Sequence, residues 1–372
     1  MKVIIAIGHG GIYSGGSHQS LYALAALKDA GIEVMAIWGD DIASDPRGFD
    51  RLKALQIPFK LLPINHRATF KSISQVRRII KDFQPEVIEC VKGKAQHHVL
   101  LASMGLPKHA IVYYRGVSQK LDFTQGLRYR LPRVDRLIAN CKALKQTMVV
   151  SGKINPAKVD VVYGEFDPAC SDPELVEASD LRNELGIHKD VTLITQLGNW
   201  ASWRGQDITI HAVSALHKKG HNIHLLFAGR DTDKLIPIIN DNKASSYITA
   251  SPYRRDPERV LKITDIIVNS STRLESLSGA LINAQTMGIP AVTSAVSGSV
   301  EIVEDGVTGI VVPPNDTAKL TQALESLLLI NEAQFKLMKE ASRQKALKLF
   351  SPESRVQRRL ECYRKAIEHR RG

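Results

Sequence analysis

"DIIVNSSTRLESLSGALINAQTMGIPAVTSAVSGSVEIVEDGVTGIVV", residues 265–312, contains three short runs rich in β-branched and other aliphatic residues. The runs cover residues 265–269, 291–293 and 309–312, and segments with glycine and serine separate them. Apolar runs of this length predict buried strands, and the longer segments between such runs have room for helices. Strands that alternate with helices indicate a parallel sheet covered by helices.

The same alternation extends along the whole chain and predicts two α/β domains in tandem. A polar, proline-containing stretch, "EFDPACSDPELVEASD" (165–180), separates two series of strands. In the first half we expect strands at 3–7, 33–38, 59–63, 86–91, 110–114, 136–139 and 159–163. In the second half we expect them at 192–196, 224–228, 246–249, 265–269, 291–293 and 309–312.

The predicted boundary between the domains lies within residues 164–175, so we expect a first domain at 1–168 and a second at 169–351. A length of 372 residues also favours two hydrophobic cores over one. Each domain is expected to be doubly wound and Rossmann-like, with ligands beyond the carboxyl ends of its strands. The cleft between the domains is the expected active site.

Composition indicates a globular protein that works in the cytoplasm. Hydrophobic residues make up 44% of the chain, yet the N-terminal apolar run is too short for a signal peptide or a membrane span. The four cysteines, Cys90, Cys141, Cys170 and Cys362, are far apart and include no C-x-x-C pair. This spacing suggests neither a zinc site nor a disulfide framework.

The positive charge is concentrated at the two ends of the chain. Residues 1–168 hold 24 basic and 14 acidic residues, a net charge of +10, and residues 352–372 hold 7 and 3, a net charge of +4. Residues 169–351 hold 19 and 21, a net charge of −2. Such a field favours an anionic partner, either a membrane surface, a charged glycan or lipid acceptor, or nucleic acid, although it is also typical of a merely soluble basic surface. Nucleic acid is the least favoured, because no recognition motif is present.

A glycine-rich loop, "GHGGIYSGGSHQS" (8–20), joins the first strand to the first helix. Tyr13 occupies the place of the third glycine of the dinucleotide fingerprint, and the spacing of Gly11 and Gly16 lacks the lysine of a triphosphate loop. Gly15 and Gly16 still predict a tight turn at a helix start, where open amides suit an oxyanion. A turn without a ligand is the alternative.

Three segments of the second half carry a family resemblance: "LGNWASWRGQDITIHAVSAL" (197–216), "HLLFAGRD" (224–231) and residues 259–323. They resemble the retaining glycosyltransferases of family 4 (group 1), which have the GT-B fold. The likeness runs over nearly the whole chain and includes "VDRLIANCKALKQTMV" (134–149). It implies an acceptor-binding first domain, a second domain that binds a nucleotide-sugar donor, and a C-terminal helix that crosses back to the first domain.

The resemblance assigns donor-binding roles around "ESLSGALIN" (275–283). Glu275 keeps the first acid of the family's E-x7-E motif, which contacts hydroxyls of the donor sugar. Asn283 replaces the second acid, which grips the ribose, and an amide binds a diol more weakly than a carboxylate. Between them, Leu277, Ser278 and Gly279 are expected to start a helix whose bare amides suit the sugar and the diphosphate.

The family's two diphosphate-binding cations fall on "GNWASWRG" (198–205). Arg204 takes the place of the lysine, and its planar fork can bind phosphate oxygens. Asn199 takes the place of the arginine, so one cation is missing. Arg230, Arg254 and Arg255 are the candidate replacements, and the sequence alone does not choose among them.

Arg115 occupies the place of a family histidine near the end of a strand in the first domain. A guanidinium there can bind an acidic sugar, the diphosphate or an anionic acceptor, or form a buried ion pair. The helix at 70–83, "FKSISQVRRIIKDF", combines an apolar face with basic residues and fits a covering helix better than a membrane-surface helix. Two further groups carry less weight: Asp231 and Asp233 are expected in a capping turn, and His97 and His98 lack a third metal ligand.

The resemblance implies a retaining glycosyltransferase that moves a sugar from a nucleotide-sugar to an anionic or lipid-linked glycan, with Glu275, Arg204 and Arg115 as catalytic residues. Cell-envelope polysaccharide or lipopolysaccharide synthesis is the expected setting, with peripheral contact at the inner face of the membrane. No metal or organic cofactor is expected. A nucleotide-sugar epimerase of the same fold and a catalytically weakened binding protein are the alternatives.

Overall fold

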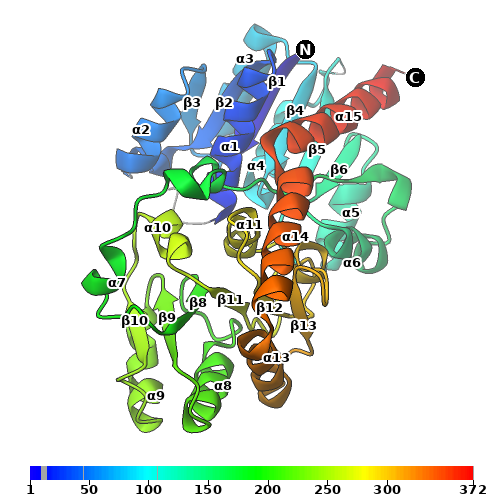
Figure 1. Cartoon of the computed structure of the whole chain (residues 1–372). Coiled ribbons are helices and arrows are strands. Elements are labelled where there is room, and N and C mark those ends of the chain that lie inside the picture. The colour runs from blue at the N-terminus through cyan, green and yellow to red at the C-terminus, as the bar shows by residue number, and fades with distance from the viewer. Residues whose placement is uncertain (10–14, 45, 107, 372) are drawn as a thin grey trace. The chain divides into compact units, whose positions relative to one another are not determined.

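The computed structural model describes residues 1–9, 15–44, 46–106 and 108–371, and the chain forms two compact units. The first unit consists of Met1–Glu165 together with Pro352–Gly372, and the second consists of Phe166–Ser351. The chain therefore leaves the first unit once and returns to it for its last helix. Each unit is a parallel sheet with helices packed on it (Figure 1).

The first unit contains a seven-stranded parallel sheet in the order β3-β2-β1-β4-β5-β6-β7. Its strands are β1 (Lys2–Ile7), β2 (Glu33–Gly39), β3 (Phe59–Leu62), β4 (Val87–Val91), β5 (Ala110–Arg115), β6 (Arg136–Ala139) and β7 (Val159–Val161). Its helices are α1 (Gly15–Asp29), α2 (Pro46–Ala54), α3 (Phe70–Phe83), α4 (Gly93–Ala102), α5 (Phe123–Arg130), α6 (Lys142–Gly152) and α15 (Pro352–Arg371). The 3-10 turns η1 (Asp40–Ser44) and η2 (Pro156–Lys158) complete it.

The second unit contains a six-stranded parallel sheet in the order β10-β9-β8-β11-β12-β13. Its strands are β8 (Thr192–Leu197), β9 (Ile223–Ala228), β10 (Ile248–Ser251), β11 (Ile266–Asn269), β12 (Ala291–Ser294) and β13 (Gly309–Val312). Its longer helices are α8 (Gln206–Lys218), α11 (Gly279–Thr286), α13 (Thr317–Leu329) and α14 (Glu332–Phe350). Its shorter helical elements are η3 (Pro168–Cys170), η4 (Pro173–Leu175), α7 (Leu181–Glu184), η5 (Thr232–Leu235), α9 (Ile236–Asp241), α10 (Pro257–Lys262) and α12 (Ser299–Ile302).

The predicted fold class of two Rossmann-like domains is confirmed, and every predicted strand is present. The runs were readable because strands of a parallel sheet are buried on both faces and so are continuously apolar. One strand is displaced: β10 covers Ile248–Ser251 rather than 246–249. The amides of Tyr247 and Ile248 donate to Ala244 O in a turn, and the Tyr247 ring stacks on His217 at a centroid distance of 3.7 Å.

Helix α3 covers its sheet as predicted for residues 70–83, with one exception. Val76 and Ile80 are buried, and Thr69 and Ser72 form a reciprocal capping box at the start of the helix. The exception is Phe70, an apolar residue that is 89% exposed. As the first helical residue, it points back past the end of the helix, since helical side chains lean toward the N-terminus.

Helix α15 packs on the first unit, against α1, β4, β5 and β6 (Figure 1). One face of the helix is apolar: Tyr363 belongs to the core of this unit, and Leu360 and Ile367 pack against it. The sequence did not indicate that Arg355 and Arg359 on the same helix would also be buried, each with only 2% of its side chain exposed. Both arginines are held by acids from other elements.

Two buried acids bind these arginines. Arg359 Nε lies 3.1 Å from Glu89 Oε2 on β4, and the same oxygen accepts from the Tyr363 hydroxyl at 2.7 Å. Arg355 Nη1 lies 3.3 Å from Glu165 Oε1, and its Nη2 donates to Gln19 O on α1 at 2.9 Å. Burial, and then the Glu89 charge, raise the pKa of Tyr363 well above its usual range, so the phenol stays a donor.

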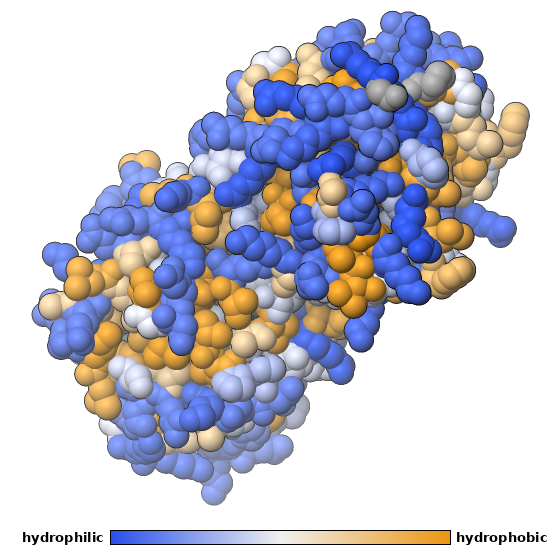
Figure 2. Space-filling model, turned by 90° about the vertical axis from the view of Figure 1, so that its right-hand side faces the viewer, coloured by the Kyte–Doolittle hydropathy of each residue, from blue (hydrophilic) through white to orange (hydrophobic). Residues whose placement is uncertain are grey.

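All four cysteines are buried and none forms a disulfide. Burial raises the pKa of the Cys90 and Cys362 thiols, which fits inert core residues. In the described ranges, no helix combines the length and the apolar character that a bilayer crossing needs. Hydrophilic side chains predominate on the face in Figure 2, with groups of hydrophobic ones between them.

We predict that Arg359→Gln destabilises the first unit by about 3–5 kcal/mol, because it leaves the buried Glu89 carboxylate without its cation. Arg364→Gln removes an exposed arginine from the same helix and is the matched control, with an expected change within about 0.5 kcal/mol. Urea unfolding followed by circular dichroism measures both. A loss below about 1 kcal/mol for Arg359→Gln would show that the buried pair does not hold α15.

Candidate functional site

The candidate site lies at the carboxyl ends of β8 and β11, where the strand order of the second sheet reverses. β8 and β11 pair in the middle of the sheet, and their crossovers run in opposite directions along it. Ligands of doubly wound sheets bind at such a switch point. The segment after β8 leads to Arg204, and the segment after β11 leads to Glu275 and Ser278.

Two glycines allow the turn after β8 to lie against β11. Gly205 has φ of 62°, and a Cβ there would lie 2.2 Å from the Ser270 carbonyl oxygen. Gly198 has φ of 148°, and a Cβ there would lie 2.9 Å from Nη1 of Arg204. Both positions therefore require glycine, and Gly198 leaves the space that the Arg204 guanidinium occupies.

Hydrogen bonds fix this turn to the end of β11. The Ser270 hydroxyl lies 2.7 Å from Gly205 O and 3.1 Å from Arg204 O, and Gln196 Nε2 donates to Arg204 O at 2.9 Å. The Thr272 amide donates to Trp203 O at 2.7 Å. These bonds hold the backbone of Arg204, and the sequence contained no signal for them because they join distant segments.

Arg204 and Glu275 form an ion pair that is shielded from solvent. Arg204 Nη1 lies 3.6 Å from Glu275 Oε2, and the side chains are 24% and 8% exposed. The same carboxylate oxygen accepts from the Ser271 hydroxyl at 3.1 Å, and the guanidinium lies 4.7 Å from the centre of the Trp203 ring. The pair therefore brings together two residues that the sequence predicted as catalytic.

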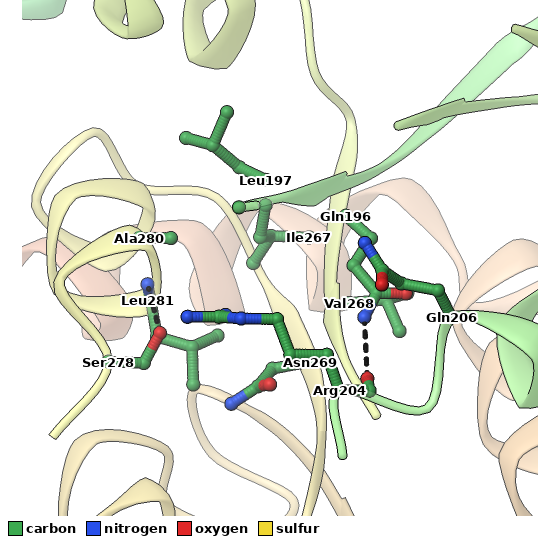
Figure 3. A pocket seen from close by; sticks show the side chains of 11 residues that line it. Gln196, Leu197, Arg204, Gln206, Ile267, Val268, Asn269, Ser278, Ala280 and Leu281 are labelled. Atoms are coloured by element: carbon green, nitrogen blue, oxygen red, sulfur yellow. Dashed lines mark hydrogen bonds between the residues drawn. The ribbon is translucent and has the colours of Figure 1, made fainter. Parts of the chain in front are cut away.

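The Arg204 side chain reaches from its turn toward the start of α11, where Ser278 and Leu281 lie (Figure 3). Ser278 is the N-cap, and its hydroxyl accepts from the Leu281 amide at 3.4 Å. The first intrahelical bond runs from Ile282 N to Ser278 O, so the amides of Gly279 and Ala280 precede the helical ladder. The predicted helix start is confirmed, although Leu277 lies outside the helix.

Gly279 differs from the glycines of the β8 turn. A Cβ at Gly279 would have nothing within 4 Å, and its φ is outside the left-handed range. The protein therefore leaves open space beside the first amide of α11. Together with Gly198, Arg204 and Asn269, this helix start lines a pocket of about 10 Å³, room for about one water molecule.

Backbone strain occurs next to Glu275. Leu274 has φ of 60°, a conformation that costs a non-glycine residue about 1–2 kcal/mol. The Gly298 amide donates to Ser276 O at 2.8 Å and holds the other side of the segment. Strained residues concentrate at functional sites, and the sequence had not singled out Leu274.

Two of the positions that depart from the family pattern, Asn199 and Asn283, make hydrogen bonds that join separate segments. Asn199 is exposed, and its Oδ1 accepts from the Arg230 amide at 3.0 Å, which joins the loops after β8 and β9. Asn283 Oδ1 accepts from the Asp167 amide at 2.8 Å. Each asparagine thus uses its carbonyl oxygen within the protein.

Among the candidate replacement cations, Arg254 is already engaged. Its guanidinium donates to Asp256 at 2.9 and 2.8 Å and to Glu184 at 2.6 Å. Hydrogen bonds to these two carboxylates raise the pKa of Arg254 above its usual range. Arg230 lies instead beside Asn199, with its guanidinium 4.8 Å from the centre of the Tyr253 ring.

Of the predicted residues in the first unit, Arg115 ends β5 and is half-buried. Its Nη2 donates to Gln119 O at 2.6 Å, and its buried Nε has no hydrogen-bond partner in the described part of the chain. No carboxylate there lies within 4 Å of it, so the ion-pair interpretation of Arg115 is wrong for these residues. The structure does not bring Arg115 together with the Arg204 pair in one compact unit.

Gly15 and Gly16 begin α1 and are exposed. A Cβ at Gly15 would have no atom within 4 Å, and the φ of Gly15 is outside the left-handed range. The backbone at this position therefore does not require glycine. Gly11 and Tyr13 of the same loop lie outside the described residues.

The structure also shows the contacts of Asp231 and of the adjacent histidines His97 and His98. Asp231 begins a 3-10 turn and lies 3.7 Å from Lys234, but its side chain makes no capping bond. His98 is buried and bonds to Ser72 and to Lys94 O, at 3.0 and 2.9 Å. His97 contacts Arg128 instead, so the two histidines do not form a metal pair.

Comparison with known proteins gives two family matches. Residues 177–345 match the family of "Glycosyl transferases group 1", and residues 14–169 match "Glycosyltransferase Family 4". A D-inositol 3-phosphate glycosyltransferase from Mycobacterium marinum is 28% identical over 254 residues, which cover 66% of this chain and 53% of the relative. The chain thus spans about half the length of the curated relatives it matches.

Two solved structures share the whole fold. A glycosyltransferase from Rickettsia africae has a TM-score of 0.87 at 19% identity, with 99% of both chains covered. A protein from Anabaena, solved in complex with UDP, has a TM-score of 0.83 at 17% identity and covers 97% of this chain and 99% of its own. With the two family matches and this fold, the chain belongs to the group 1, family 4 glycosyltransferases of the GT-B fold.

Proposed function

We propose that this protein is a retaining, metal-independent glycosyltransferase whose second unit binds a nucleotide-sugar donor, with a UDP-sugar as the favoured donor. One observation carries the proposal: a shielded Arg204–Glu275 pair lies beside the open amides of α11, at the switch point of the second sheet. The Anabaena neighbour was solved in complex with UDP, which supports this choice of base.

The proposed role of the site is to stabilise the leaving diphosphate. Arg204 supplies a cation, and the amides of Gly279 and Ala280 supply hydrogen-bond donors at the positive end of a helix. Donors fixed before the reaction stabilise developing charge without reorganisation. The open space beside Gly279 lets a phosphate oxygen approach its amide closely.

The second cation of the family is, in this proposal, supplied by Arg230. Arg230 lies beside Asn199, the residue that replaces the family's arginine, whereas Arg254 is engaged by two carboxylates. The Asn199 side chain holds the Arg230 backbone, so Asn199 acts as a positioning residue. Asn283 keeps its amide hydrogens and one lone pair of its oxygen for the ribose, because the Asp167 amide uses the other lone pair.

In the proposed reaction, the bond between the anomeric carbon and the diphosphate oxygen breaks and a glycosidic bond forms on the same face of the sugar. The acceptor hydroxyl passes its proton to a phosphate oxygen of the leaving group. Glu275 accepts hydrogen bonds from donor-sugar hydroxyls while it orients Arg204. Positioning and charge stabilisation then account for catalysis, without a protein nucleophile.

We assign an anionic acceptor to the first unit, where basic residues are in excess. The curated relatives are named for D-inositol 3-phosphate, which carries a phosphate. Among the predicted residues of the first unit, Arg115 is the best candidate to bind an anion, because its buried Nε has no hydrogen-bond partner in the described part of the chain. A cell-envelope or lipopolysaccharide role, and work in the cytoplasm at the membrane face, stay predictions.

A binding protein with weakened turnover is the second candidate, because Asn199 and Asn283 have become structural ties. Proton NMR of UDP-glucose with the protein separates the candidates. Transfer or slow hydrolysis supports the transferase, conversion to another sugar without acceptor indicates an epimerase, and binding without any conversion across an acceptor panel supports the weakened binder.

We predict that Arg204→Gln weakens UDP affinity about tenfold or more, because a charge-assisted phosphate contact is lost. Arg230→Gln is expected to weaken it less, and Glu275→Gln to lower donor turnover more than UDP affinity. Lys218→Gln, an exposed residue of α8, is the control. Isothermal titration calorimetry and donor-hydrolysis rates measure these effects. An unchanged UDP affinity in Arg204→Gln would contradict the proposal that UDP binds at this site.

A second prediction concerns Gly279→Ala. Since a Cβ there meets no atom within 4 Å, we expect unfolding stability to stay within about 1 kcal/mol of wild type. UDP affinity is expected to fall, because the methyl group occupies the approach to the first amides of α11. Thermal unfolding and calorimetry test both halves, and unchanged affinity would place the diphosphate elsewhere.

A third prediction concerns metal removal. If Arg204, Arg230 and the α11 amides neutralise the diphosphate, EDTA leaves donor turnover unchanged within about twofold. Turnover measured with EDTA, and again after added Mg²⁺ or Mn²⁺, checks this. An EDTA-dependent loss that Mn²⁺ restores would contradict metal-independent catalysis.

A further inference from the structure

A second cavity lies in the first unit, beside the segments that follow β3 and β4. Its volume is about 420 Å³, within the range of small-molecule sites. The lining residues are His66, Arg67, Ala68, Lys94, His97 and Leu101. The loop after β3 and the start of α4 lie at the carboxyl edge of the sheet, and the cavity continues from there along the exposed face of α4 to Leu101.

The cations at this cavity lack counter-ions. In the described ranges, neither Arg67 nor Lys94 has a carboxylate within 4 Å, and both are exposed. Arg128 on α5 donates to the His97 ring and has no carboxylate within 4 Å among those residues, although its charge acts on the Asp122 carboxylate at the start of the same helix. Its buried Nε has no hydrogen-bond partner there. Three permanent positive charges therefore surround one cavity or contact its wall.

Cations near the amino ends of the same sheet are neutralised instead. Asp160 lies 2.7 Å from Arg136, and Asp135 lies 2.6 Å from Arg370. At the cavity, Asp40 and Asp41 contact His66, at 3.6 Å and 3.3 Å. Arg67 and Lys94, which line the cavity, are thus available to an external anion, and Arg128 adds positive charge through its contact with His97.

His97 adds a local reporter to the cavity wall. Its Nε2 accepts from Arg128, which requires an unprotonated nitrogen at that position. Burial, and then the charges of Arg128 and His98, lower the pKa of His97 below its usual range. Lys94 from the same helix and His66 and Arg67 from the loop after β3 are the other charged or titratable groups that line the cavity.

We propose that this cavity binds the phosphate group of the acceptor, with Arg67 and Lys94 as direct ligands and Arg128 and His97 on its wall. A dianion suits a site with several unpaired cations, and Leu101 and Ala68 leave an apolar side for a carbon skeleton. The identification of the ligand as the acceptor rests on the proposed function, whereas anion binding by the cavity does not. The phosphate source is either a soluble sugar phosphate or a lipid headgroup.

The experiment follows the His97 ring by proton–carbon NMR of the full chain while inorganic phosphate is added. A bound dianion favours the protonated ring, so the pKa of His97 is expected to rise. Lys94→Gln and Arg67→Gln should each weaken phosphate affinity about fivefold or more, and high salt should reduce the effect. Lys81→Gln is the control, because it removes an exposed cation of α3 that lies about 16 Å along the helix from its first residue, Phe70.

Two competitors then identify the source of the phosphate. Displacement of inorganic phosphate by glucose 6-phosphate indicates a soluble acceptor, and displacement only by phosphatidylglycerol vesicles indicates a lipid headgroup. Both results support the site. A His97 signal that does not respond to millimolar phosphate, or variants that bind like wild type, overturns it.

UDP titration of the same variants separates this proposal from the proposed function. Unchanged UDP affinity in Lys94→Gln and Arg67→Gln, together with weaker phosphate binding, supports two separate sites. If wild type binds phosphate at His97 but does not bind UDP, the donor proposal fails and the phosphate site stands. If UDP binds but His97 does not respond, the reverse holds.

Discussion

The contact between Arg204 and Glu275 is the interaction on which the candidate site depends. An arginine that is held in place before a ligand arrives loses less side-chain entropy on binding than an unrestrained one. Glu275 orients this guanidinium while both side chains stay largely shielded from water. Gly205 lets the turn after β8 lie directly against Ser270 at the end of β11, and Gly198 leaves the space that the Arg204 guanidinium occupies.

A different kind of buried charge holds the first unit together. Helix α15 is the last element of the chain, yet it packs across strands β4, β5 and β6, which lie much earlier in the sequence. Glu89 and Glu165 lie inside this contact and bind the arginines of α15. Because a buried acid is costly without its partner, these pairs favour one position of the helix over others.

The positions and contacts of the predicted site residues were readable from the sequence to different degrees. Glu275, Ser278 and Arg204 lie in a segment whose pattern is local, and the structure brings them together in one unit. The fates of Asn199 and Asn283 were not readable, because their partners come from the loop after β9 and from the start of the second unit. The sequence indicated only that each asparagine replaces a charged ligand of the family, whereas the structure shows that each accepts a hydrogen bond from a distant backbone amide.

The sequence by itself determined the two parallel sheets, the place of their strands and the family of the chain, since buried strands and glycine-dependent turns leave local patterns. Only the tertiary structure decided which charges are neutralised. Arg254 meets Glu184, 70 residues away in the sequence, whereas Arg67 and Lys94 have no carboxylate within 4 Å in the described part of the chain. Charge pairing is a distance relation between residues far apart in sequence, so it arises only when the chain folds.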